Sequence, residues 1–358
     1  FPEFWADMST HLCMRYEVPA APAPRGLATA PALPGADLSG AAPTESPAVV
    51  LVGMRGAGKT SLGRAAATAL GMGFIDLDDV FVAQRGPIID FVARSGWPAF
   101  RQEELSLLEA TLAAHPRSTI ISCGGGIVEN ARARDALAAY WPVVQVVKPI
   151  DDVVAYLQAD ASRPDLGEPP RSVYSRRAPW YDECSDFDLL VAPGEKDWQR
   201  PTAQLLATLR RVLGLAPPAP ARPHSFFLSM TEPKLEPLSP GALAPADDIF
   251  QGCDLVELRA DLLHSLEPTD VRTQIALLRQ RTELPILFTV RSKAQGGAYE
   301  GDAARYLALN RLALRAGCEW IDLEADRDGA PMRALAAEAK DSGVQLIGSH
   351  HYLGPFPG

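Results

Sequence analysis

The sequence lacks any long apolar run. No stretch of this 358-residue chain approaches the roughly 18–20 apolar residues that a membrane-spanning helix needs. A secretory signal, with its basic start and short apolar segment, is also missing. We therefore predict a cytoplasmic protein that works without a membrane.

Cysteine is scarce and poorly placed for cross-linking. The five cysteines are odd in number, widely spread and free of CxxC spacing: Cys13, Cys123, Cys184, Cys253 and Cys318. This pattern argues against a disulfide framework and against a zinc site, and it fits a reducing compartment.

Positive charge is in deficit. The chain has 34 Lys and Arg against 44 Asp and Glu, for a formal net charge of -10. An acidic surface attracts neither nucleic acid nor an anionic membrane, so we expect no nucleic-acid partner. An acidic protein that binds an anionic ligand needs a local group of donors. The 47% hydrophobic content is sufficient for packed cores.

Proline and alanine gather in two segments that predict linkers. Residues 18–46 and 215–224 cannot bury much apolar surface. Between them lies a predicted domain, 47–214, and after them a block, 225–358. The head, 1–17, begins with Phe1 and not with methionine, so we expect a piece of a longer polypeptide.

Apolar runs alternate with helical periodicity in the middle domain. The predicted strands are AVVLVG from Ala48, FIDLD from Phe74, TIISC from Thr119, VVQVV from Val143 and FDLLV from Phe187. Continuous apolar strands separated by helices predict an α/β fold with a parallel sheet covered on both faces.

The C-terminal block carries a repeat of about 30 residues. Its predicted strands are SFFLSM, DLVELRAD, PILFTVRS, EWIDLEAD and VQLIGSHH. Polar residues follow these strands at Glu257, Arg259, Arg291, Glu324, His350 and His351. A (β/α)8 barrel places its chemistry at that end of its strands. Five strands are present where a barrel needs eight, so we predict an incomplete barrel.

A phosphate-binding loop stands between the first strand and the first helix. The segment Gly53–Thr60, GMRGAGKT, fits G-x-x-x-x-G-K-[ST]. Its amides can cradle phosphate, its lysine can neutralise charge, and its threonine can hold Mg²⁺. The predicted ATP-binding residues are Gly53, Met54, Arg55, Gly56, Ala57, Gly58, Lys59, Thr60 and Ser61. The motif predicts nucleotide binding without specifying the reaction.

Other polar positions fit the same site. Asp76 and Asp78 are expected to close the second strand on one face, one serving the metal and one the acceptor hydroxyl. Gly124–Gly126 follow the third strand and allow close approach to a ligand. A solvated strand end and a plain turn remain the alternatives.

Three arginines could serve phosphate or an anionic acceptor. Arg101 lies in FRQEE, Arg163 in SRPDLGEPPR and Arg177 in RRAPWY. A loop around Arg163 could close over phosphates. Surface ion pairs and an ordinary basic loop are the alternative explanations.

Together these motifs, in this order, resemble shikimate kinase over the whole middle domain. The resemblance implies that Asp76 lies at the magnesium and that Asp78 binds the shikimate hydroxyls. It also implies that Arg101 and Arg177 bind the carboxylate, that Gly124, Gly125 and Gly126 touch shikimate, and that Arg163 contacts phosphates. Lys59, Asp78 and Arg163 would be catalytic.

GMRGAGKT, SCGGGIVE and RRAPWYDECS are most similar to the kinase domain of fungal pentafunctional arom polypeptides. The head, FPEFW, is similar to the end of an enolpyruvylshikimate-phosphate synthase domain.

The C-terminal block resembles type I 3-dehydroquinate dehydratase through VELRAD, FTVRSKAQGG and GSHH. That resemblance implies that Arg259 and Arg291 bind substrate and that His351 is the general acid/base. Its Schiff-base lysine would lie on a later strand, and Tyr352 stands where the family has aspartate. Lys234 and Lys293 are poor substitutes, so we predict kinase activity and no dehydratase activity.

Three functions remain open on the sequence. The first is shikimate phosphorylation within a multifunctional arom protein, with ATP, Mg²⁺ and shikimate as ligands, the other pathway domains on the same polypeptide, and a possible homodimer of the full-length protein. The second is a regulator that resembles quinate-pathway repressors. The third is another P-loop kinase, such as a gluconate or adenylate kinase.

Overall fold

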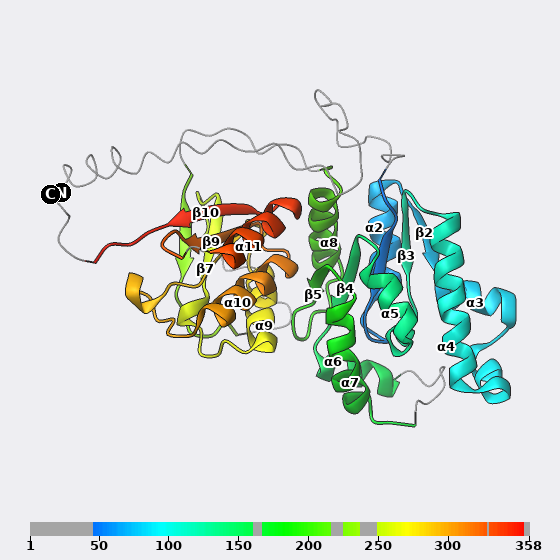
Figure 1. The fold of residues 1–358 in the computed structure, drawn as a ribbon. Helices are drawn as coiled ribbons and strands as arrows, with labels where there is room; N and C mark the ends of the chain where they lie inside the picture. The colour runs from blue at the N-terminus through cyan, green and yellow to red at the C-terminus, as the bar shows by residue number, and fades with distance from the viewer. Residues whose placement is uncertain (1–45, 160–166, 216–224, 237–248, 328, 354–358) are drawn as a thin grey trace.

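The computed structural model describes residues 46–159, 167–215, 225–236, 249–327 and 329–353. Two five-stranded sheets stand side by side in Figure 1, each with its own helices. The predicted head, nearly all of the first linker and most of the second lie outside these ranges, as does Arg163. None of the helices described is long and apolar enough to cross a membrane.

The first sheet is parallel, with the order β2-β3-β1-β4-β5. Its strands are β1 (Val49–Val52), β2 (Gly73–Asp76), β3 (Thr119–Ser122), β4 (Val143–Val147) and β5 (Phe187–Leu190). Every residue of β1 is fully buried. A strand in the middle of a sheet with both faces covered requires this continuous apolar run.

Helices cover both faces of this sheet. They are α2 (Lys59–Leu70), α3 (Leu77–Arg85), α4 (Ile88–Ala114), α5 (Ala131–Ala138), α6 (Ile150–Ala159), α7 (Pro170–Glu183) and α8 (Gln199–Val212). Val49 and Leu51 pack with α2 and α8, whereas Val50 and Val52 pack with α4 and α7. The alternation of side chains along a strand therefore builds two separate cores.

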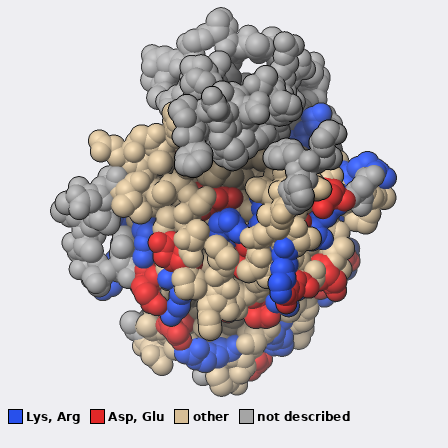
Figure 2. All heavy atoms as spheres, turned by 90° about the vertical axis from the view of Figure 1, so that its left-hand side faces the viewer, with Lys and Arg blue, Asp and Glu red and all other residues tan. Residues whose placement is uncertain are grey.

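The second sheet is also parallel, but its strands follow chain order, β10-β9-β8-β7-β6. They are β6 (Phe227–Met230), β7 (Leu255–Arg259), β8 (Ile286–Thr289), β9 (Trp320–Glu324) and β10 (Gln345–Ser349), with helices α9 (Pro268–Arg279), α10 (Ala303–Arg315) and α11 (Ala330–Asp341). Sequential parallel neighbours joined by helices are the arrangement of a (β/α) barrel wall. Figure 2 shows acidic and basic side chains interspersed over the described part of this domain's outer face.

The structure confirms the predicted fold class. All ten predicted strands form, and a helix follows the phosphate loop. One local prediction was wrong. Strand β2 ends at Asp76, and Asp78 lies in the first turn of α3. The Asp76 carboxylate accepts the backbone N–H of Asp78 and caps that helix, so the chain turns there instead of extending.

Candidate functional site

The phosphate loop joins β1 to α2. Gly56 and Gly58 have φ of 81° and 101°, left-handed conformations that favour glycine. A Cβ on Gly53 would lie 2.6 Å from the carbonyl oxygen of Val146, so only glycine lets the loop pack against β4. A glycine turn that ends at a helix N-terminus is a ready anion site.

Lys59 begins α2 and is only 7% exposed. Its Nζ donates hydrogen bonds to the carbonyl oxygens of Gly53 at 2.9 Å and Met54 at 3.1 Å. The ammonium group is thus held over the mouth of the loop, where a phosphate would be. Ser61 follows in the first turn of α2 and is exposed.

An oxygen pair lies beside the loop. The Thr60 hydroxyl donates to Asp76 Oδ2 at 2.7 Å, while Asp76 Oδ1 caps α3. Hydroxyl and carboxylate oxygens are ligands that Mg²⁺ accepts, and the ion usually completes its shell with phosphate oxygens and water. Thr60 and Asp76 therefore fit the predicted metal position.

A cavity of about 320 Å³ opens next to the loop. Its lining includes most of the acceptor residues predicted from the sequence: Asp78, Arg101, Gly125, Gly126 and Arg177. Arg55, from the phosphate loop, lines the same cavity. The predicted nucleotide and acceptor sites are thus neighbours in space.

A shared carboxylate holds the two cavity arginines. Glu129 Oε1 accepts from Arg177 Nε at 2.8 Å, and Glu129 Oε2 lies 3.6 Å from Arg101 Nε. Arg177 is 2% exposed and also donates to the Gly125 carbonyl oxygen at 2.8 Å. The Tyr181 hydroxyl donates to the same oxygen at 2.6 Å. This network fixes the position of both guanidinium groups at the cavity.

Glu104 is buried beside Arg101, and the two form an ion pair. Burial raises the pKa of the Glu104 carboxyl from its ordinary 4.5 to about 7, although the charge of Arg101 opposes the change. The ring of Trp97 lies 4.9 Å from the Arg101 guanidinium carbon, which adds a cation–π contact.

The three glycines after β3 are required by close contacts. A Cβ on Gly124 would lie 2.4 Å from Glu104 Oε1 and 2.7 Å from Asp78 Oδ1. A Cβ on Gly126 would lie 2.0 Å from Arg101 Nη1. Gly124 and Gly126 therefore leave room for functional side chains to approach the backbone, and Gly125 leaves room for the backbone of Arg55, 2.7 Å from where its Cβ would lie.

Sequence reasoning missed Glu129, Tyr181 and the titration of Glu104. Glu129 lies in the quoted SCGGGIVE and Tyr181 in RRAPWY, but each acts through a partner about 50 residues away. A charged residue three positions after the glycine run was the one available signal for Glu129.

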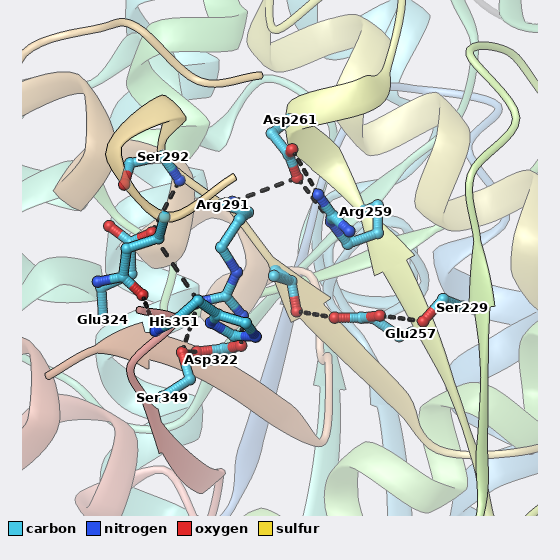
Figure 3. A network of polar contacts seen from close by, with 12 residues as sticks. Ser229, Glu257, Arg259, Asp261, Arg291, Ser292, Asp322, Glu324, Ser349 and His351 are labelled. Carbon is cyan, nitrogen blue, oxygen red and sulfur yellow. Dashed lines mark hydrogen bonds and ion pairs between the residues drawn. The ribbon is translucent and has the colours of Figure 1, made fainter. Parts of the chain in front are cut away.

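A second polar network lies at the C-terminal ends of the second sheet's strands (Figure 3). Glu257 accepts from Thr289 at 2.7 Å and from Ser229. Arg259 pairs with Asp261 through two contacts of 2.9 Å. The predicted cluster therefore forms on β6 to β10.

Arg291 lies at the centre of this network and is 6% exposed. It donates to Ser349 Oγ at 2.6 Å and to Asp322. Glu324 accepts the Ser292 N–H at 2.8 Å. Asp322 and Ser349, which carry much of this network, were missed by the sequence analysis.

His350 and His351 follow β10 directly. The backbone N–H of His351 donates to Gln295 Oε1 at 2.9 Å. Partial burial and the neighbouring Arg291 lower the pKa of the His351 imidazole below its ordinary 6.5. The ring is therefore largely neutral at neutral pH and can accept a proton.

Each of the two parts of the chain matches the model of a known protein family. Residues 55–205 match the family model of shikimate kinase, and residues 227–358 match that of type I 3-dehydroquinase. A shikimate kinase from Acinetobacter baumannii in complex with shikimate aligns with a TM-score of 0.41 at 24% identity, over 46% of this chain and 94% of that one.

Pentafunctional AROM polypeptides match across both parts. Those of Mycosarcoma maydis and Malassezia globosa are 37% and 40% identical over 350 and 311 residues. Each match covers 85% of this chain but only 20% and 18% of those proteins. The chain thus spans about a fifth of the length of these curated relatives. Along its length the chain therefore carries, in this order, a segment that matches the shikimate kinase model and a segment that matches the type I 3-dehydroquinase model, and it is similar to one stretch of the AROM polypeptides.

Proposed function

We propose that the first domain transfers the γ-phosphoryl group of ATP to the 3-hydroxyl of shikimate. The observation that carries this proposal is the cavity beside the phosphate loop, in which Asp78 faces a site shared with Arg101 and Arg177. A carboxylate for a hydroxyl and two guanidinium groups for an anion suit a hydroxylated carboxylic acid.

On the nucleotide side, Gly53–Ser61 hold the phosphates through backbone amides and the N-terminus of α2. Lys59 neutralises charge on the transferring group. Arg163, which lies outside the described residues, is proposed to contact the phosphates as well. Thr60 and Asp76 would hold Mg²⁺, which supplies charge neutralisation between the phosphates when it is bound.

On the acceptor side, Arg101 and Arg177 bind the carboxylate of shikimate, and Gly124–Gly126 bring the backbone against its ring. Asp78 accepts a hydrogen bond from the 3-hydroxyl and orients it. As the new O–P bond forms and the bond to ADP breaks, the hydroxyl proton passes to Asp78. Most of the catalysis is positioning and charge neutralisation.

In the second domain, we propose that Arg259 and Arg291 occupy substrate-binding positions and that His351 occupies the position of the general acid/base; dehydratase activity itself is not proposed for this chain. Support comes from their meeting at the C-terminal ends of the strands and from the neutral state of His351. The proposed setting is the shikimate pathway, with further pathway domains on the same polypeptide. The free thiols of Cys123, Cys184, Cys253 and Cys318 support a reducing cytoplasm.

The test is a coupled assay of ADP release with the purified chain, MgATP and shikimate. We expect shikimate-dependent release that falls at least about a hundredfold in Lys59→Ala, because the charge over the loop is lost. Lys234→Ala removes an exposed lysine, 61% accessible, and should leave the rate unchanged. If the wild-type chain binds ATP or shikimate but releases no ADP, it is a binding protein of the regulatory kind.

A further inference from the structure

Strand β5 is an edge strand of the first sheet, and its two faces belong to different domains. Phe187 and Leu189 pack into the core of the kinase domain. Leu190, on the alternate side, packs into the core of the second domain together with Ala192. The second domain therefore lies directly against β5, with α9 and α10 facing it (Figure 1).

Asp188 lies at the centre of this contact. Its side chain is completely buried, and two arginines from the second domain flank it. Arg272 reaches Oδ2 at 2.9 Å and Arg315 reaches Oδ1 at 3.0 Å. A fully buried carboxylate is tolerated only when it is paired in this way. The contact is thus specific in charge as well as in shape.

The same two arginines also hold the C-terminal end of α7 and the residues just after it. Arg272 pairs with the carboxylate of Asp182 at 3.1 Å. Arg315 donates to the Asp182 carbonyl oxygen at 3.1 Å and also to Ser185. The last carbonyl groups of a helix lack partners within the helix, so these bonds tie down an end that would otherwise fray.

Helix α7 contributes Arg177 to the lining of the acceptor cavity. Tyr181 directly precedes Asp182, and Arg177 lies about one turn further back. Both side chains donate to the carbonyl oxygen of Gly125. A contact that fixes the end of α7 therefore also fixes the residues that shape the cavity.

We propose that the second domain braces the acceptor site of the kinase domain, with Arg272 and Arg315 as positioning residues. They touch neither ligand and act through α7 on Arg177. The interaction surface is the β5 face of the kinase with Asp188 at its centre, and its partner is the α9–α10 face of the second domain. The kinetic part of this proposal rests on the proposed kinase activity.

The experiment uses the full chain with Arg315→Met, which keeps a long apolar side chain but removes the bonds that Arg315 makes to Asp188, Asp182 and Ser185. Arg311→Met is the matched control, because Arg311 lies one turn earlier on α10 and pairs with Glu338 inside the second domain. Hydrogen exchange of α7 peptides and the KM values for shikimate and ATP are measured for each.

In Arg315→Met we expect faster exchange in 170–183 and a rise in the KM for shikimate of about fivefold or more, with the KM for ATP unchanged. Arg311→Met should match the wild type. Should Arg315→Met fail to fold, Arg315→Lys, which keeps the charge but not the forked geometry, is expected to show the same split.

Unchanged exchange and unchanged KM for shikimate in an active Arg315→Met chain would overturn the proposal. A wild-type chain without shikimate-dependent ADP release would instead overturn the proposed function. In that case the hydrogen exchange of α7 still tests whether the second domain stabilises this helix, because hydrogen exchange does not depend on turnover.

Discussion

Glu104 and Arg101 form an ion pair in the acceptor cavity whose charge changes with pH near neutrality. Arg101 is one of the two guanidinium groups proposed to bind the carboxylate of shikimate, and Glu104 competes for it. Because burial holds the pKa of Glu104 at about 7, this competition changes within the neutral pH range. Below that pH the Glu104 carboxyl is protonated, so it no longer competes with an incoming anion for Arg101.

We predict that shikimate affinity weakens as the pH rises through about 7. Between about pH 6 and about pH 8 we expect a loss of roughly tenfold, or ~1.4 kcal/mol. In Glu104→Gln the group cannot ionise, so the affinity should stay at its low-pH level. Calorimetric titration with shikimate at both pH values measures this. A wild-type affinity that is flat over this interval would contradict the prediction.

The raised pKa of Glu104 also makes the stability of the folded protein depend on pH. The pKa of Glu104 is raised in the folded protein, so its contribution to stability is fully present below the ordinary 4.5 and is lost as the pH rises through about 7. Glu104→Gln should therefore flatten the pH dependence of the unfolding midpoint between those two values.

At the scale of one element, the loop Gly124–Gly126 sets the distance between the backbone and the acceptor. A Cβ on Gly126 would lie 2.0 Å from Arg101 Nη1, so Gly126→Ala must displace that guanidinium group. We expect kcat/KM for shikimate to fall about a hundredfold, because a displacement of about 1 Å is costly in a positioned site. ATP affinity should be unchanged.

Steady-state kinetics with each substrate varied in turn checks this expectation. Gly348→Ala is the control, because a Cβ there meets nothing within 4 Å. An equal loss in both substrates would point to a general distortion of the fold and not to Arg101.

Elements were easier to predict than the contacts between them. Buried strands such as β1 are apolar throughout, and the phosphate loop carries its own glycines, so local sequence was sufficient for both. Asp78 was placed on a strand because alternation was extended past Asp76, whose side chain instead caps a helix. Glu129 was missed because its partners are brought to it by the fold of distant segments.

At the scale of the whole molecule, the contact between the domains was beyond sequence reasoning. The linker composition predicted separate domains, yet Asp188 pairs with residues 84 and 127 positions later. Nothing in the pattern FDLL distinguishes a strand edge that faces water from one that faces a second domain. The difference appears only in the structure, where Leu189 packs into the core of the first domain and Leu190 into the core of the second.

That alternation gives a prediction about how the chain unfolds. Leu189 and Leu190 are neighbours with similar burial, 4% and 6% exposed, but they belong to the cores of different domains. Truncating either to alanine should cost about 2–5 kcal/mol. We expect Leu190→Ala, a change in the kinase sheet, to speed hydrogen exchange in β7 and β8 of the second domain, because it opens a cavity in their core. Leu189→Ala should speed exchange in β1 and β4 and leave β7 and β8 protected.

If Leu190→Ala leaves the exchange of β7 and β8 unchanged, the second domain does not depend on β5 for its core, and the two domains are stable independently of each other.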